Sequence, residues 1–176
     1  MKRVFALLCL FLSASASLVV AGCSSSMADE HSQVMHWKGM VGAITIPNVS
    51  NPIGNIDSGT FAWTARAGSA TVDLVNSTAS FDVDGLVING STFSGTAGPI
   101  TAVTGTLVCN AGAATQAVLD TPVVPLSLQG SAHFAGSIAS IPANCANPIF
   151  LIRISTPAGA AGRWIATGTE PGPATN

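Results

Sequence analysis

Short runs of alternating hydrophobic and polar residues cover most of this chain. The runs are rich in β-branched residues and are separated by Gly, Pro, Asn and Ser. No long stretch keeps the 3.6-residue period of an amphipathic helix, so the pattern predicts an all-β protein. The predicted strands lie near residues 41–46, 60–65, 70–75, 79–88, 101–109, 115–120, 124–128, 131–138, 148–154 and 162–168.

The alternation within residues 60–84 also predicts how the first strands pair. Hairpin loops at 66–69 and 76–79 would bring every large apolar side chain to one face of the sheet. The predicted core then contains Phe61, Trp63, Val72, Leu74, Phe81 and Val83, with Trp63 opposite Val72 and Leu74 opposite Phe81. Two later runs, around Phe150 and Trp164, alternate in the same way and predict two half-buried strands. Together these strands predict a two-sheet antiparallel β-sandwich or a flattened barrel.

The N-terminus follows a different pattern, in which a basic start precedes an apolar run. Lys2 and Arg3 come before Val4–Leu12, and the segment Leu18-Val-Val-Ala-Gly-Cys23 resembles a bacterial lipobox. The apolar run is too short to span a membrane, so residues 1–22 are predicted to be a removed lipoprotein-type signal peptide. The resemblance implies that an acyl chain such as palmitate is attached to Cys23. The alternative is an ordinary secretory peptide cut after Ala16 or Ala21.

A lipidated Cys23 would tether the protein to a membrane of the bacterial cell envelope, facing the periplasm or the exterior. Residues 23–40 are polar and are predicted to be a tether, residues 41–170 to be the sandwich domain, and residues 171–176 to be a disordered tail. Once Cys9 is removed and Cys23 is modified, Cys109 and Cys145 remain as a pair in an oxidising compartment. This pair predicts one disulfide.

Several C-terminal segments resemble a family of uncharacterised exported bacterial proteins. They are Gly105-Thr-Leu-Val-Cys109, Asp120-Thr-Pro-Val-Val-Pro-Leu-Ser127, Asn147-Pro-Ile-Phe-Leu-Ile-Arg153 and Gly162-Arg-Trp-Ile-Ala166. The resemblance covers roughly residues 85–168. It implies a β domain with paired cysteines and no assigned activity, so it provides no active-site residues.

Composition excludes some classes of function. Only 8% of the residues are charged, and after residue 22 the chain has four cationic and eight anionic side chains, a formal charge of −4. Nucleic acid is therefore not expected as a partner. His133 is the only histidine of the predicted domain, and no G-x-S-x-G motif is present. The sequence favours a non-catalytic envelope module with a structural or binding role, whose partner is an envelope protein or a glycan.

Two groups of residues suggest alternatives that involve a metal. The segment before the domain contains Met27, His31, Met35, His36 and Met40, which on a helix would gather ligands suited to Cu(I). The predicted register places Asp73 across from Asp82, with Asp84 on the same face, where Ca²⁺ would relieve the repulsion of the carboxylates. A further alternative is an envelope hydrolase that uses Asp73, Asp82 or His133. Trp37 and Trp164 are candidates for stacking on a sugar, although Trp164 alternates like a core residue.

Overall fold

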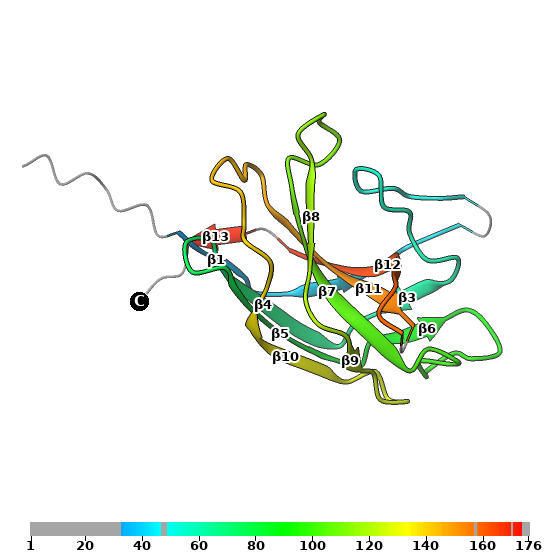
Figure 1. The fold of residues 1–176 in the computed structure, drawn as a ribbon. Helices are drawn as coiled ribbons and strands as arrows, with labels where there is room; N and C mark the ends of the chain where they lie inside the picture. The colour runs from blue at the N-terminus through cyan, green and yellow to red at the C-terminus, as the bar shows by residue number, and fades with distance from the viewer. Residues whose placement is uncertain (1–32, 47–48, 157, 170, 174–176) are drawn as a thin grey trace, which may run out of the picture.

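The chain folds into two stacked antiparallel sheets, as the computed structural model shows for residues 33–46, 49–156, 158–169 and 171–173 (Figure 1). Sheet A has the strand order β10-β5-β4-β1-β13, and sheet B has the order β2-β12-β11-β7-β8. Two further strands, β3 (Ala62–Thr64) and β6 (Val87–Asn89), form a small separate pair. Every regular element of the described residues is a strand, so the prediction of an all-β sandwich is confirmed.

The strands of sheet A are short and mostly alternate between buried and exposed positions. Their bounds are β1 Val34–Trp37, β4 Ala67–Asp73, β5 Thr78–Asp84, β10 Ala132–Ser137 and β13 Pro171–Pro173. In β5 the buried residues are Ala79, Phe81 and Val83, and the residues between them are exposed or half-buried. Such alternation is typical of a sheet that packs on a core with one face and meets solvent with the other.

The strands of sheet B are less exposed. Their bounds are β2 Met40–Gly42, β7 Ala102–Cys109, β8 Ala117–Asp120, β9 Val124–Pro125, β11 Ile149–Ser155 and β12 Ala161–Gly168. The strands β8 and β9 pair with successive parts of the same edge of β7. All eight residues of β7 are buried, which requires that both faces of this strand are covered.

One side of the sandwich is closed by a bent two-stranded ribbon. The strand β1 pairs with β13 in sheet A, whereas β2 pairs with β12 in sheet B. The β1–β2 segment and the β12–β13 segment therefore pass from one sheet to the other at the same corner. At the bend, the Thr169 amide donates to the Gly39 carbonyl at 2.9 Å. A Cβ on Gly168 would lie 2.7 Å from Trp37 Cγ, so glycine allows the strand to pass close to this ring.

Aromatic side chains from both sheets fill the centre of the core. The Phe150 ring of β11 lies 5.6 Å from the Trp37 ring and 5.9 Å from the Phe81 ring, both on sheet A. Trp37 is fully buried, so this candidate offers no surface for stacking on a sugar. Trp164 is also buried, but on the outer face of sheet B, where it packs with Ile56 and Leu151.

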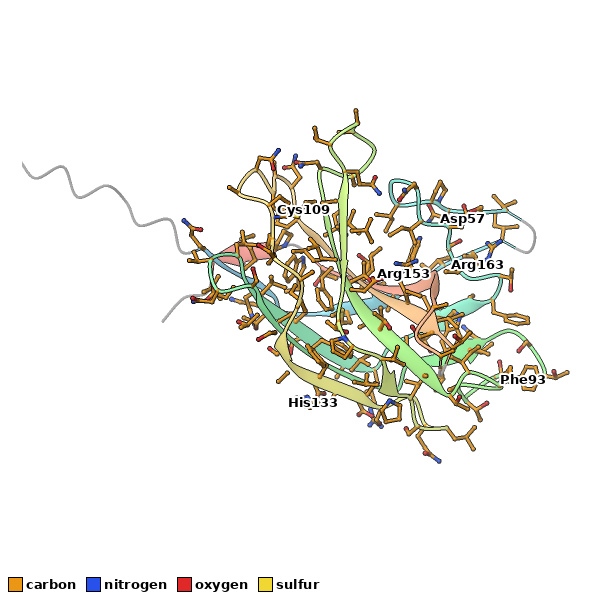
Figure 2. All side chains as sticks on the ribbon, in the orientation of Figure 1. Asp57, Phe93, Cys109, His133, Arg153 and Arg163 are labelled. Atoms are coloured by element: carbon orange, nitrogen blue, oxygen red, sulfur yellow. A yellow bond between two sulfur atoms is a disulfide. The ribbon has the colours of Figure 1, made fainter. Side chains whose placement is uncertain are left out.

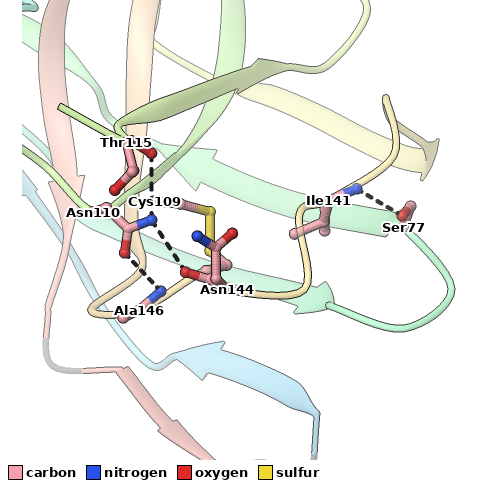
Figure 3. Close-up of a disulfide and its surroundings, with 8 residues drawn as sticks. Ser77, Cys109, Asn110, Thr115, Ile141, Asn144 and Ala146 are labelled. Carbon is pink, nitrogen blue, oxygen red and sulfur yellow. Dashed lines mark hydrogen bonds between the residues drawn. A yellow bond between two sulfur atoms is a disulfide. The ribbon is translucent and has the colours of Figure 1, made fainter. Parts of the chain in front are cut away.

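The predicted disulfide between Cys109 and Cys145 is present (Figure 3). It joins the end of β7 to the long connection between β10 and β11. Asn110 follows in the left-handed region, with φ of 53°, and its side-chain amide donates to the Thr115 and Asn144 carbonyls. Its side-chain oxygen accepts from the Ala146 amide at 3.1 Å. The disulfide and Asn110 together hold this connection at the end of β7.

The predicted pairing of the first strands is wrong, although it assigned several core residues correctly. β3, Ala62–Thr64, pairs with β6, Val87–Asn89, so Trp63 lies opposite Ile88. Phe81 lies opposite Ala70, four residues before the predicted Leu74. An even shift keeps every side chain on its predicted face, and Val72, Phe81 and Val83 are buried. Phe61, outside any strand, is 42% exposed.

Sheet A also uses residues at both ends that were expected to lie outside the domain. The predicted tether includes β1, and the predicted tail includes β13. β1 is inserted between β4 and β13, and it buries Trp37. Prolines at both ends of β13 are tolerated at the edge of a sheet, because an edge strand leaves one side of its backbone unpaired.

Candidate ligand-binding site

The outer face of sheet A carries a row of polar side chains that crosses three strands. The register pairs Ser69 of β4 with Asp82 of β5, and Asp82 with His133 of β10. His133 Nδ1 lies 3.4 Å from Asp82 Oδ2, and both side chains are about two-thirds exposed. Figure 2 shows His133 on the side of sheet A, away from Asp57, Arg153 and Arg163. Ser69, Asp82 and His133 therefore present donors and acceptors directly to solvent.

A second group of polar side chains lies next to this row. The Arg66 guanidinium donates to Asp84 Oδ2, and the Ser131 hydroxyl donates to Asp84 Oδ1 at 2.9 Å. The hydrogen bond from Arg66 and then the one from Ser131 lower the pKa of Asp84 below its ordinary value. Asp84 is thus held in its charged form between a cation and a hydroxyl.

Two adjoining depressions connect these side chains into one shallow trough. The depressions have volumes of about 520 Å³ and about 500 Å³, and Asp82 lines both of them. We call this surface the sheet A trough, and define it by Lys38, Arg66, Ser69, Asp82, Asp84, Ser131 and His133. Neighbouring strands lie about 4.8 Å apart, so the row from β4 to β10 spans roughly 10 Å. The trough is wide, open and lined by charges of both signs.

The arrangement of the trough does not form a nucleophile and base pair. His133 lies in β10 and Ser131 directly precedes this strand, and each is paired with a different aspartate. The Ser131 hydroxyl donates its proton to Asp84 instead of facing the His133 ring. A serine hydrolase needs a hydrogen bond between nucleophile and base, and Ser131 and His133 do not form one.

The residues suggested for Cu(I) are separated by the fold as far as the structure describes them. Met35 and His36 lie in β1, and Met40 lies in β2. His36 Nδ1 pairs with the Thr71 hydroxyl at 2.8 Å, whereas Met35 packs against the core and Met40 is buried in it. Alternation along a strand sends neighbouring side chains to opposite faces. The helical spacing expected for these ligands therefore does not apply to residues 34–37.

The predicted pair of facing aspartates is also wrong. Asp73 lies opposite Thr78, at the far end of the β4–β5 hairpin from Asp82. Its carboxylate accepts from the amides of Val75 and Asn76 and from the Asn76 side chain. These hydrogen bonds, led by the backbone amide of Asn76, lower the pKa of Asp73. Asp73 is a turn residue, while Asp82 and Asp84 remain on the outer face as predicted.

Some predicted features lie outside the described residues. They are the signal peptide, Cys23, Met27 and His31. Within the described residues, no group of three or more His, Cys, Asp or Glu side chains could hold a metal ion. The same part of the chain contains no helix that is long and apolar enough to cross a membrane.

The outer face of sheet B holds a polar network that sequence reasoning missed. Arg153 donates to the carbonyls of Ala161 and Gly162 at 2.9 and 2.7 Å, and forms an ion pair with Asp120 at 3.2 Å. The pairing of β11 with β12 shifts register on both sides of Arg153, which leaves these carbonyls available. A charged residue in the otherwise apolar run of β11 was the available signal. Its side chain is only 12% exposed and has a structural role.

A loop covers the other end of this face. Trp164 Nε1 donates to the Asn51 carbonyl at 2.9 Å, and the Trp164 amide donates to the Asp57 carbonyl. Arg163, next to it, donates to the Ser58 carbonyl at 2.9 Å. These bonds hold residues 51–58 across β12 and bury Trp164. Asp57 of this loop lines one depression together with Arg153 and Arg163, and the three residues lie on the same side of the molecule (Figure 2).

Comparisons with protein-family models, curated proteins and solved structures found no match to this chain. The structure itself defines the class of this protein. It is an all-β sandwich with a disulfide, in which the outer face of sheet A is polar and solvated and the central strands of sheet B are covered.

Proposed function

We propose that this protein is a non-catalytic binding module anchored to the bacterial cell envelope by a lipid on Cys23. In this proposal the sheet A trough holds a polyhydroxylated envelope polymer, such as the glycan strands of peptidoglycan. The anchor rests on the lipobox resemblance of Leu18–Cys23.

The observation that carries the binding role is the row Ser69, Asp82 and His133. These residues come from three different strands, point to solvent and offer both donors and acceptors. A sugar polymer presents hydroxyls that donate and accept in equal measure, so a surface of mixed polarity suits it. The flanking pairs of Asp84 with Arg66 and Ser131 extend this surface along the sheet. Strands fixed in a sheet hold these groups in position before the ligand arrives, which reduces the entropy lost on binding.

The trough is tested by co-sedimentation of the purified protein with insoluble peptidoglycan. We expect the wild type to sediment and the triple variant Ser69→Ala, Asp82→Asn, His133→Gln to remain in the supernatant. The matched control is Thr78→Ala, Ser80→Ala, Ser137→Ala, which changes three hydroxyls of the same face outside the trough. Equal sedimentation of the wild type and the trough variant would exclude the trough as the site. A wild type that stays soluble would exclude peptidoglycan as its ligand.

The anchor is tested separately by labelling cells with a fatty-acid analogue. We expect the wild type to be labelled and Cys23→Ala to be unlabelled and released from the membrane fraction. An unlabelled wild type would end the lipoprotein assignment and leave the trough unaffected.

A further inference from the structure

Arg163 lies between two depressions on the covered side of the sandwich. It belongs to β12, and its Nη1 donates to the Ser58 carbonyl at 2.9 Å. One depression has a volume of about 440 Å³ and includes Asp57, and the other has a volume of about 240 Å³ and includes Val49 and Thr60. Arg163 lines both, so its guanidinium is accessible from two sides.

The pairing of Arg163 differs from that of the other arginines in the described residues. Arg66 is paired with Asp84, and Arg153 with Asp120. Within the described part of the chain, no carboxylate oxygen lies within 4.0 Å of the Arg163 guanidinium. A guanidinium has five N–H donors, and the Ser58 carbonyl accepts from one nitrogen only. The remaining donors form a fork of the kind that binds a carboxylate.

The smaller depression combines this positive charge with a hydroxyl and an apolar wall. Thr60 supplies a hydroxyl that makes no hydrogen bond to other described residues, and Val49 is 56% exposed. Ile46, whose carbonyl accepts from the Val49 amide at 3.0 Å, is also largely exposed. A ligand in this depression would bind more tightly if it carried one negative charge to pair with Arg163 and a short aliphatic group to cover Val49.

The neighbouring Asp57 restricts the charge of that ligand. Its carboxylate accepts from the Ser50 hydroxyl at 2.6 Å, and Ser50 also lines the smaller depression. A nearby negative charge opposes a dianion more strongly than a monoanion. A carboxylate therefore fits this depression better than a phosphate does.

We propose that the depression formed by Val49, Ser50, Thr60 and Arg163 is a binding site for a carboxylate that carries a short aliphatic group. This chemistry is shared by free short-chain acids and by the C-terminus of a peptide that ends in an aliphatic residue. The site lies on the opposite sheet from the trough and is independent of the proposed glycan binding.

The test titrates the purified full chain and follows the side-chain Nε–H NMR signals of arginine. The chain contains only four arginines, so the Arg163 signal can be assigned from Arg163→Lys. We expect isovalerate to shift the Arg163 signal saturably at millimolar concentrations, and the neutral isovaleramide to leave it unchanged. Acetyl-Gly-Gly-Val is then titrated with a free and with an amidated C-terminus. Tighter binding of the free peptide than of isovalerate would indicate a peptide C-terminus as the ligand, and weaker binding would indicate a free acid. The amidated peptide should not bind.

Two variants decide whether Arg163 and Thr60 form the site. Arg163→Gln should weaken isovalerate binding by about tenfold or more, followed through the backbone amide of Thr60. Because Arg163→Gln can loosen the loop at Ser58, Thr60→Val provides a second variant that leaves this contact intact and should weaken binding about threefold or more. Lys38→Gln removes a cation from the β1–β2 connection, which does not line this depression, and should leave isovalerate binding unchanged as the control.

Three outcomes would overturn the proposal. The first is equal binding of isovalerate and isovaleramide. The second is unchanged isovalerate affinity in both Arg163→Gln and Thr60→Val. The third is displacement of isovalerate by inorganic phosphate at lower concentration, which would show that the site selects a dianion.

Discussion

The outer faces of the two sheets differ although both sheets pack on the same core. In β5 of sheet A, Asp82 is exposed and its buried neighbours all face inward. In β7 of sheet B, both the inward Leu107 and the outward Val108 are fully buried. The outer face of sheet A thus meets solvent directly, whereas the outer face of sheet B is covered at its central strands and exposed at Val118 of β8 and Val41 of β2. The outer face of sheet A is therefore the one that leaves polar side chains in solvent for the proposed binding.

The residues available for binding follow from this difference. On sheet A, Asp82 and His133 are both largely exposed side chains. On sheet B, Thr106 donates to Asp120, which also pairs with Arg153, so these side chains already have partners within the protein. On the same side of the molecule, the Arg163 guanidinium has N–H donors that are not used by the Ser58 carbonyl, and it lines a depression.

The largest effect is expected from removing the side chain that anchors the cover of sheet B. Trp164→Ala deletes a 4% exposed ring that packs on Ile56 and Leu151, and removes its bond to the Asn51 carbonyl. The expected loss is about 3–5 kcal/mol of unfolding free energy, measured by urea denaturation. Ser80→Ala, on the solvated face of sheet A, should change stability by less than about 0.5 kcal/mol. Equal effects of the two variants would contradict the proposed difference between the faces.

A somewhat smaller effect is expected from the disulfide. Cys109→Ala combined with Cys145→Ala opens a loop whose ends are 36 residues apart. The unfolded chain then gains freedom, which should lower stability by about 2–4 kcal/mol. Thermal unfolding monitored by circular dichroism measures this loss. A melting temperature that is unchanged in the double variant would show that Asn110 and the packing of Ile141 already hold the connection.

The two ion-paired arginines allow a direct comparison of the faces. Arg153→Met keeps the aliphatic stem but leaves the carbonyls of Ala161 and Gly162 and the Asp120 carboxylate without their donor. We expect a loss of about 1–3 kcal/mol in urea denaturation, because these groups are partly removed from water. Arg66→Met breaks a pair that water surrounds, and its melting temperature should stay close to the wild type. The reverse order would mean that Arg153 is not a structural residue.

The smallest effect concerns the response of sheet A to acid. The pKa of Asp73 is lowered in the fold, so its contribution to stability is fully present above the ordinary aspartate pKa of 3.8 and is lost as the pH falls through the lowered value. Asp73→Asn keeps an oxygen for the amides of Val75 and Asn76 but cannot titrate. Urea midpoints measured from about pH 5 downward should therefore fall less steeply in the variant. Identical slopes would contradict this role of Asp73.

Much of the fold could be predicted from local alternation, because each face of a strand is a property of neighbouring residues. The even shift between the predicted and observed pairing of β4 with β5 preserved the buried set of Val72, Phe81 and Val83. The same shift separated Asp73 from Asp82, so the predicted calcium site failed where the core prediction succeeded. For the trough, the sequence indicated Asp82 and Asp84 together on one face and His133 separately, whereas Ser69 and Ser131 were identified only from the fold.

Short strands that are stabilised by pairing with residues distant in the sequence could not be predicted. Four residues, Val34–Trp37, give too little alternation to distinguish a strand from a polar tether. Their pairing with β4 and β13 is what buries Trp37. β13 contains two prolines, which argue against a strand locally but are accommodated at the sheet edge.

The sequence by itself determined the all-β class, the single disulfide and the side of β4 and β5 that faces the core. These features depend on residue type and on a period of two, which are local properties. Only the tertiary structure decided which strands pair, that Arg153 is used internally while Arg163 is left accessible, and that sheet A keeps its outer face in solvent. Those choices depend on contacts between residues far apart in the chain, such as Ser58 with Arg163, whose free energy is available only after the chain has folded.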